Sequence, residues 1–303
     1  MKKIQFLLIF VVMIATGFVF TRCENKTEEI VDPVVDPIVI KLATSALLGS
    51  YLTDKDGNAL YFFSSDANGA NNCTGGCITA WPVFNVNGLM QAQLGPGLDM
   101  ADFNSITSAN GNQLTYKGWP LYYYAPAGIR EASGKTTGEG VGGVWFVAKP
   151  DYTIMIAKLQ LTGKDLKTYV VSPANVYSEG LGATTYFTDA MGRTLYSFFR
   201  DSTNNNNFTK ADFSNNGVWP LYETDKVVVP SVLDKTLFGS IMVYGHKQLT
   251  YKGWPMYYVG SDVDATTGKF RGNNKGVYGP LPMKWPIFFY DKLNDLYPHA
   301  PKK

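Results

Sequence analysis

The chain reads Gln113-Leu114-Thr115-Tyr116-Lys117-Gly118-Trp119-Pro120-Leu121-Tyr122-Tyr123 in its first half, and this stretch returns as Gln248 to Tyr258. Ten of the eleven residues are identical, and Met256 stands in place of Leu121. The same spacing of 135 residues places the segment from Gly57 to Asp66 over the segment from Gly192 to Asp201. Self-similarity at a fixed spacing indicates an internal duplication, so we expect two homologous domains in tandem.

A shorter pattern recurs within each half. A turn glycine is followed, three residues later, by an apolar residue and a tyrosine, at Gly57, Gly118, Gly192 and Gly253. Glycine tolerates the positive φ of a tight connection, and β-branched or aromatic residues flank it, which together predict a β-hairpin. The expected fold class is all-β: two β-rich domains, residues 44–150 and 151–303, each a sandwich or small barrel with two related hairpins. The second domain would end in a short C-terminal tail.

The composition narrows the classes of function. The 303 residues are 45% hydrophobic, 14% aromatic and 17% charged, which argues for folded domains and against disorder. The net charge of +2 gives no signature of a nucleic-acid partner. Only two histidines, His246 and His299, occur in the chain, so the usual general bases and zinc ligands are scarce. No catalytic residue is therefore predicted, and a non-enzymatic role is favoured.

The N-terminal residues predict export. Lys2 and Lys3 precede an apolar run from Phe6 to Phe20, which is short for a membrane span and typical of a signal peptide over residues 1–22. Cys23 follows and would be the lipidated (palmitoylated) residue of a bacterial lipoprotein, although Arg22 stands where a small residue is usual. The alternative is an ordinary signal peptide or an uncleaved anchor. Residues 23–43 would form an extended tether, and the lipid would make the membrane a partner.

The two remaining cysteines, Cys73 and Cys77, form an even pair. In an oxidising envelope we expect a local disulfide between them. The second half aligns Phe208 with Cys73, and Asp212 or Phe213 with Cys77, so two phenyl rings are expected there instead. This substitution favours a structural bridge; a redox or metal role is the alternative.

The residues after two of the hairpin turns carry a recognisable motif. Tyr61 to Asp66 and Tyr196 to Asp201 both read Tyr-x-Phe-x-x-Asp, whereas the stretch from Tyr122 has Ala127 in place of the aspartate. With the Cys73–Cys77 segment, they resemble the bacterial secreted-repeat lipoproteins, closely over about 44–150 and more loosely over about 180–290. The resemblance implies an exported repeat protein, and that family brings no established activity with it.

The motif residues have two interpretations. Tyr61 and Phe63 share one face of a strand, and Asp66 follows its end, so they would be a core pair with a turn-forming carboxylate. Alternatively they form an aromatic ledge with an adjacent carboxylate that binds a sugar or a cation. The candidate ligand-binding residues are Tyr61, Phe63, Asp66, Tyr196, Phe198, Asp201, Trp119 and Trp254.

No cofactor is predicted. The segment Asp54–Asn58 begins like a calcium loop, but Ser65 stands where a bidentate glutamate is required, so a bound metal ion is only left open. We expect a lipid-anchored envelope protein, at the outer membrane and the cell surface, that binds a glycan or another envelope protein without catalysis. The alternatives are an electron-transfer or metal-handling accessory protein and a hydrolase that uses carboxylates such as Asp66 and Asp201.

Overall fold

A computed structural model describes residues 38–277, 284–291 and 297–302. The predicted signal peptide, Cys23 and most of the tether lie outside the described residues. Residues 37–303 form one compact unit, and the domain boundary at residue 150 stays a prediction. For description we call residues 38–150 the first half and residues 151–302 the second half.

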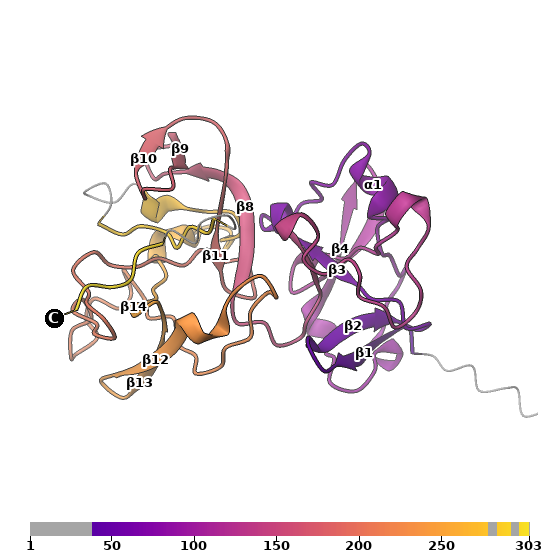
Figure 1. Ribbon diagram of the computed structural model, residues 1–303, viewed down its shortest axis with the longest axis horizontal. Coiled ribbons are helices and arrows are strands. Elements are labelled where there is room, and N and C mark those ends of the chain that lie inside the picture. The colour runs from indigo at the N-terminus through magenta and orange to yellow at the C-terminus, as the bar shows by residue number, and fades with distance from the viewer. Residues whose placement is uncertain (1–37, 278–283, 292–296, 303) are drawn as a thin grey trace, which may run out of the picture. The chain divides into compact units, whose positions relative to one another are not determined.

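The described residues are mostly β, in small sheets with one short α-helix, which confirms the expected fold class (Figure 1). The first half contains β1 (Ile40–Ser45), β2 (Gly49–Asp54), β3 (Tyr61–Phe63), α1 (Cys77–Ala80), β4 (Phe103–Ser108), β5 (Gly111–Tyr116), β6 (Trp119–Pro120) and β7 (Trp145–Val147). The second half contains β8 (Met155–Thr162), β9 (Thr168–Val171), β10 (Tyr177–Glu179), β11 (Ala183–Thr188), β12 (Phe238–Val243), β13 (His246–Tyr251) and β14 (Trp254–Pro255). Short 3-10 helices lie at Ser64–Asp66, Gln91–Gln93, Met100–Asp102, Pro126–Gly128, Val141–Gly143, Lys235–Leu237, Gly260–Asp262 and Lys275–Val277.

The duplicated stretch forms the same three-stranded antiparallel sheet twice. In the first half the order is β4-β5-β6 and in the second half it is β12-β13-β14. Tyr116 pairs with Trp119 across the last turn of the first sheet, and Tyr251 pairs with Trp254 in the second. Both turns place a lysine and a glycine at positive φ, 49° and 75° at Lys117-Gly118, which is the type I′ geometry that suits a right-twisted hairpin.

The two halves differ between their first and second long strands. β1 and β2 are joined by the three residues from Ala46 to Leu48. The equivalent strands β8 and β11 are separated by an insertion that contains β9 and β10, and the four strands form one sheet in the order β10-β9-β8-β11 (Figure 1).

A pair of tyrosines joins the two repeats within each half. Tyr61 and Tyr122 exchange backbone hydrogen bonds at 2.9 and 3.1 Å, and Tyr196 and Tyr257 do so at 2.9 and 2.8 Å. All four side chains are fully buried. The motif tyrosines therefore lie where the two repeats of each half meet, and this position determines what their hydroxyls can reach.

Candidate functional site

The motif aspartates Asp66 and Asp201 are buried at the ends of short turns. So is Asp262, which stands five residues after Tyr257 as Asp66 stands five residues after Tyr61. Asp66, Asp201 and Asp262 are 0%, 1% and 0% exposed. One carboxylate oxygen of each accepts a backbone N–H: from Asn72, from Asn207 and from Lys275, at 2.7 Å in every case. A buried carboxylate needs such partners, because an unpaired one is costly to remove from water. One oxygen of each aspartate thus shapes the turn that follows the strand.

The second oxygen of each aspartate accepts a tyrosine hydroxyl from the other repeat of the same half. Tyr257 donates to Asp201 and Tyr196 donates to Asp262, both at 2.7 Å, so the two repeats of the second half exchange equivalent bonds. In the first half Tyr122 donates to Asp66 at 2.5 Å. The motif residues therefore form cross-links between repeats, which we call the tyrosine–carboxylate network.

The first half completes its network with a residue that the motif does not contain. The fourth aspartate position holds Ala127, and Glu131 supplies the carboxylate instead. Tyr61 donates to Oε1 of Glu131 at 2.5 Å, and the backbone N–H of Thr137 donates to Oε2 at 2.7 Å. Sequence reasoning missed Glu131. Its six-residue spacing to Thr137, which matches that of Asp66 to Asn72, is recognisable only from the hydrogen bonds of the structure.

Burial controls the protonation of this network. Desolvation raises the pKa of Asp66, Asp201 and Asp262 to about 7, although the hydrogen bonds from tyrosine and backbone oppose the shift. Desolvation and the neighbouring carboxylates raise the pKa of the tyrosines above its ordinary value, so these phenols stay neutral and donate.

The predicted aromatic ledge packs inside the protein. Phe63 stacks on Trp145 at 4.1 Å between ring centroids, and Trp145 stacks on Trp81 at 3.8 Å. The second half repeats this arrangement with Phe198, Trp285 and Trp219, at 4.4 and 3.7 Å. Phe63 is partly buried and the other five rings are buried.

The two remaining candidate tryptophans also lie against the protein. The indole N–H of Trp119, which is fully buried, donates to the carbonyl of Ala190 at 2.9 Å, and that of Trp254, which is partly buried, donates to the carbonyl of Pro298 at 2.9 Å. A ligand role for the candidate residues stays a prediction, and their placement is that of core residues.

The Cys73–Cys77 disulfide is present, with 5.3 Å between the two Cα atoms. The expectation for the second half was half right. Phe208 occupies the place of Cys73, because the backbone N–H of each donates to the side-chain oxygen of the asparagine two residues earlier, Asn71 for Cys73 and Asn206 for Phe208. Asn215, and not Asp212 or Phe213, stands at the place of Cys77. The backbone N–H of Trp81 donates to the carbonyl of Cys77, and that of Trp219, likewise four residues later, donates to the carbonyl of Asn215.

A hydrogen bond replaces the disulfide in the second half. The side-chain amide of Asn215 donates to the carbonyl of Phe208 at 2.7 Å. The misalignment has a simple cause, since the loop from Phe208 to Asn215 is three residues longer than the loop from Cys73 to Cys77.

The calcium-like segment is a turn whose carboxylate has protein partners. Asp54 Oδ1 accepts the backbone N–H groups of Asp56 and Asn58, and Oδ2 accepts the hydroxyl of Tyr123 at 2.9 Å. Asp189 is bonded in the same way, with Tyr258 at 2.8 Å. The described residues contain no group of three or more His, Cys, Asp or Glu side chains placed to hold a metal ion.

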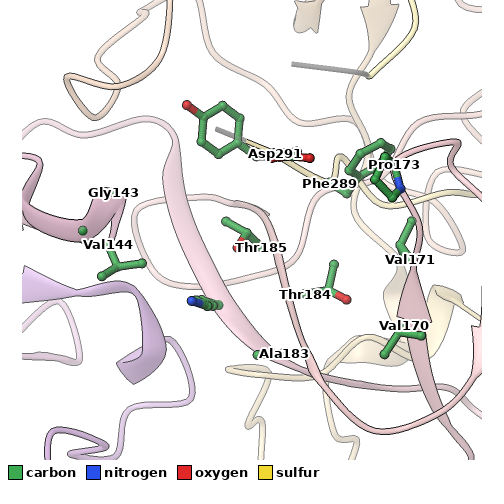
Figure 2. Close-up of a pocket in the computed structure, with 13 residues that line it drawn as sticks. Gly143, Val144, Val170, Val171, Pro173, Ala183, Thr184, Thr185, Phe289 and Asp291 are labelled. Atoms are coloured by element: carbon green, nitrogen blue, oxygen red, sulfur yellow. The ribbon is translucent and has the colours of Figure 1, made fainter. Parts of the chain in front are cut away.

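A cavity of about 330 Å³ lies beside β8 and β11 (Figure 2). Lys158, Thr184 and Thr185 contribute polar groups, while Val170 and Val171 of β9 contribute apolar ones. Its remaining lining residues are Gly142, Gly143, Val144, Pro173, Ala183, Phe289, Tyr290 and Asp291. No residue of the tyrosine–carboxylate network lines this cavity, so the motif and the cavity are separate features.

Comparison with known families identifies the repeats. The model of a family described as a secreted repeat of unknown function matches residues 43–85 and 104–149. The first half therefore matches the secreted-repeat model twice. No curated protein and no solved structure matched the chain.

Tyr61 lies in the first matched segment and Tyr122 in the second, so this tyrosine pair joins the two matched repeats. The second half lies outside the matched residues, but its Tyr196–Tyr257 pair, its carboxylates and its ring stack repeat those of the first half. Among the described residues, no helix has the length and apolar character needed to cross a membrane. The family description indicates a secreted protein.

Proposed function

We propose that the protein is a lipid-anchored lipoprotein of the bacterial envelope that acts as a non-enzymatic interaction or ligand-binding module. The observation that carries the non-enzymatic part of this proposal is the tyrosine–carboxylate network. In it the motif residues bond one another across the repeats and so stabilise the fold. Asp66 and Asp201 each have both oxygens bonded within the protein and are at most 1% exposed. A catalytic carboxylate must reach its substrate within hydrogen-bonding distance, so the hydrolase alternative receives no support from these residues.

Two further observations support an extracytoplasmic, anchored protein. The Cys73–Cys77 disulfide suits an oxidising compartment, and the matched family is one of secreted repeats. Cys23 is the remaining cysteine, and it follows an apolar segment and precedes a polar stretch with repeated proline, as a lipidated residue followed by a tether would. In this proposal the lipid holds the protein at the outer membrane, and the tether presents the folded repeats at the cell surface.

Metabolic labelling tests the anchor. The full chain, expressed in a related bacterium with an alkyne-tagged palmitate, should carry the label and fractionate with membranes. Cys23→Ala should abolish the label. The matched control is Cys73→Ala/Cys77→Ala, which removes the other two cysteines and should keep the label. Persistence of the label in Cys23→Ala, or its absence from the wild-type chain, would overturn the proposed anchor.

A further inference from the structure

Three rings and a carboxylate lie at the turn between β12 and β13, outside the tyrosine–carboxylate network: Tyr244 and His246 are exposed, and Phe213 is partly buried. We call Phe213, Tyr244, His246 and Glu223 the tip cluster. The ring of Phe213 lies 4.6 Å from that of His246 and 6.1 Å from that of Tyr244, between centroids. Nδ1 of His246 lies 2.8 Å from Oε2 of Glu223. Tyr244 is 60% exposed, which is unusual for a ring in a protein that buries most of its aromatics.

Two rings of the tip cluster are held in an unfavourable backbone conformation. Phe213 has φ of 54° and Tyr244 has φ of 47°. The left-handed region is a genuine outlier for bulky side chains, and the type I′ turn at Tyr244-Gly245 would be better served by asparagine. Residues kept in such conformations persist where the surrounding structure over-determines them, and they cluster at ligand-binding sites. An exposed tyrosine in this conformation therefore marks the turn as a candidate site.

The first half has the equivalent strands without the tip cluster, although its turn at Ala109-Asn110 lacks the positive φ of Tyr244-Gly245. Gly75 stands two residues before Cys77, as Phe213 stands two before Asn215, and its φ of 58° matches. The hairpin register places Ala109 at the position of Tyr244 and Gly111 at that of His246. The equivalent backbone bonds of Phe84 and Tyr222 place Asn85 at the position of Glu223. The secreted-repeat skeleton therefore forms without these four side chains, and the second half has them in addition.

The acidic side chains beside the tip cluster have partners within the protein. Glu223 contacts Nδ1 of His246, and on the same strand Lys247 bonds Asp225 at 2.8 Å. The described surface of β13 therefore presents no unpartnered basic group that would attract an anionic ligand. The paired groups do offer fixed, planar donors and acceptors beside aromatic faces. A neutral ligand with many hydroxyl groups matches this surface, because ring faces attract its C–H bonds and the polar groups bond its hydroxyls.

A small cleft adjoins the cluster on the same hairpin. Its volume is about 120 Å³, and Asn204, Asn205, Asn206 and Tyr244 line it together with Ile241, Met242 and Val243. The side chains of Asn205 and Asn206 are held by Asn207 and Gln248. Amide groups fixed in this way add further donors and acceptors of the kind that hydroxyl groups bind.

We propose that the tip cluster is a binding site for a neutral saccharide, which stacks on Tyr244 and Phe213 and bonds the His246–Glu223 pair. This inference deepens the proposed function and rests on it, since it names the ligand class of the module. It places the site on the second half alone. The buried motif residues take no part in it.

The test uses the mature folded chain from Cys23→Ala, which is not lipidated, and calorimetry with neutral hexasaccharides of glucose, mannose, galactose and N-acetylglucosamine. At least one should bind, and Tyr244→Asn should weaken its affinity by about tenfold, which corresponds to about 1.4 kcal/mol. The same substitution creates the preferred type I′ turn, so it should raise the unfolding temperature. Phe213→Gly, which installs the residue of the first half, should also weaken binding.

The matched control is Met191→Ala, which trims an exposed apolar side chain outside the tip cluster and should leave affinity unchanged. Absence of binding to all four saccharides, or binding that Tyr244→Asn and Phe213→Gly leave intact, would overturn the inference. Palmitate labelling distinguishes the two proposals, because these variants should all anchor normally when Cys23 is present. A photo-crosslinker at position 244 that captures a protein, with no saccharide bound, would keep the module and refute the ligand class.

Discussion

Each carboxylate of the tyrosine–carboxylate network has one oxygen for its own turn and one for the neighbouring repeat. Asp201 bonds the N–H of Asn207 with the first and the hydroxyl of Tyr257 with the second. Glu131 performs the same two tasks from a different place in the chain, with Thr137 and Tyr61. The requirement at this position is therefore a carboxylate with two correctly placed donors, and a longer side chain satisfies it from four residues further on.

Removing Glu131 should be costly despite its absence from the motif. Glu131→Ala would leave the buried hydroxyl of Tyr61 without its acceptor, and an unsatisfied buried group costs about 1–3 kcal/mol. The loss should be visible as a lower urea midpoint with an unchanged slope. Glu179→Ala is the control, because the ion pair of Glu179 with Lys167 is exposed and should contribute less than about 1 kcal/mol. Equal midpoints for the two variants would contradict the role assigned to Glu131.

Among the elements, the hairpins were predictable and the cross-links were not. The turns at Lys117-Gly118 and Lys252-Gly253 follow from local chemistry, since few residues accept positive φ. The acceptor of Tyr61 lies 70 residues away, and no local pattern specifies such a pairing. The residue of the second half that corresponds to Cys77 was misplaced because the duplicated halves differ in loop length. Local rules therefore predict turns and strands, while the contacts that join repeats need the assembled fold.

The turn glycine before β14 should be intolerant of substitution. Gly253 has φ of 81°, and an added Cβ would lie 3.1 Å from Cγ2 of Thr203. Gly253→Ala should lower the free energy of unfolding by about 1–3 kcal/mol, the usual cost of a side chain in a strained backbone region. Gly217→Ala is the control, because no atom lies within 4 Å of its added Cβ and its φ is not positive. Thermal unfolding of both variants measures the difference in stability. A Gly253→Ala variant as stable as the wild type would refute the turn assignment.

At the scale of the whole molecule, the buried acids couple stability to pH. Asp66, Asp201 and Asp262 have a pKa of about 7 in the folded protein against an ordinary value of 3.8. Between these values the folded state binds more protons than the unfolded state, so their contribution is fully present below about pH 4 and is lost as the pH rises through about 7. Each acid adds a slope of up to about 1.4 kcal/mol per pH unit. The exposed Asp225, whose pKa is lowered by its bond to Lys247, acts in the opposite direction on a solvent-screened surface.

Stability measured in urea should therefore fall from pH 5 to pH 8. Asp201→Asn keeps an acceptor for Tyr257 and removes one titrating group, so it should flatten the dependence by roughly a third of the contribution of the three acids. Asp225→Asn should leave the slope nearly unchanged. A wild-type stability that rises over this pH range would show that the hydrogen bonds to these carboxylates outweigh their desolvation.

Tyr196 donates to Asp262, and Tyr257 donates to Asp201, so each repeat of the second half supplies what the other lacks. This reciprocity limits how many repeats such a chain can gain or lose. A repeat expressed alone would bury a phenol without an acceptor and a carboxyl without a donor. Two repeats together satisfy both groups, so the smallest unit with all of these hydrogen bonds is a pair of repeats. Repeats can therefore be added or removed without this penalty only in pairs. A truncation that leaves an odd number of repeats would yield a destabilised chain that quality-control proteases can attack.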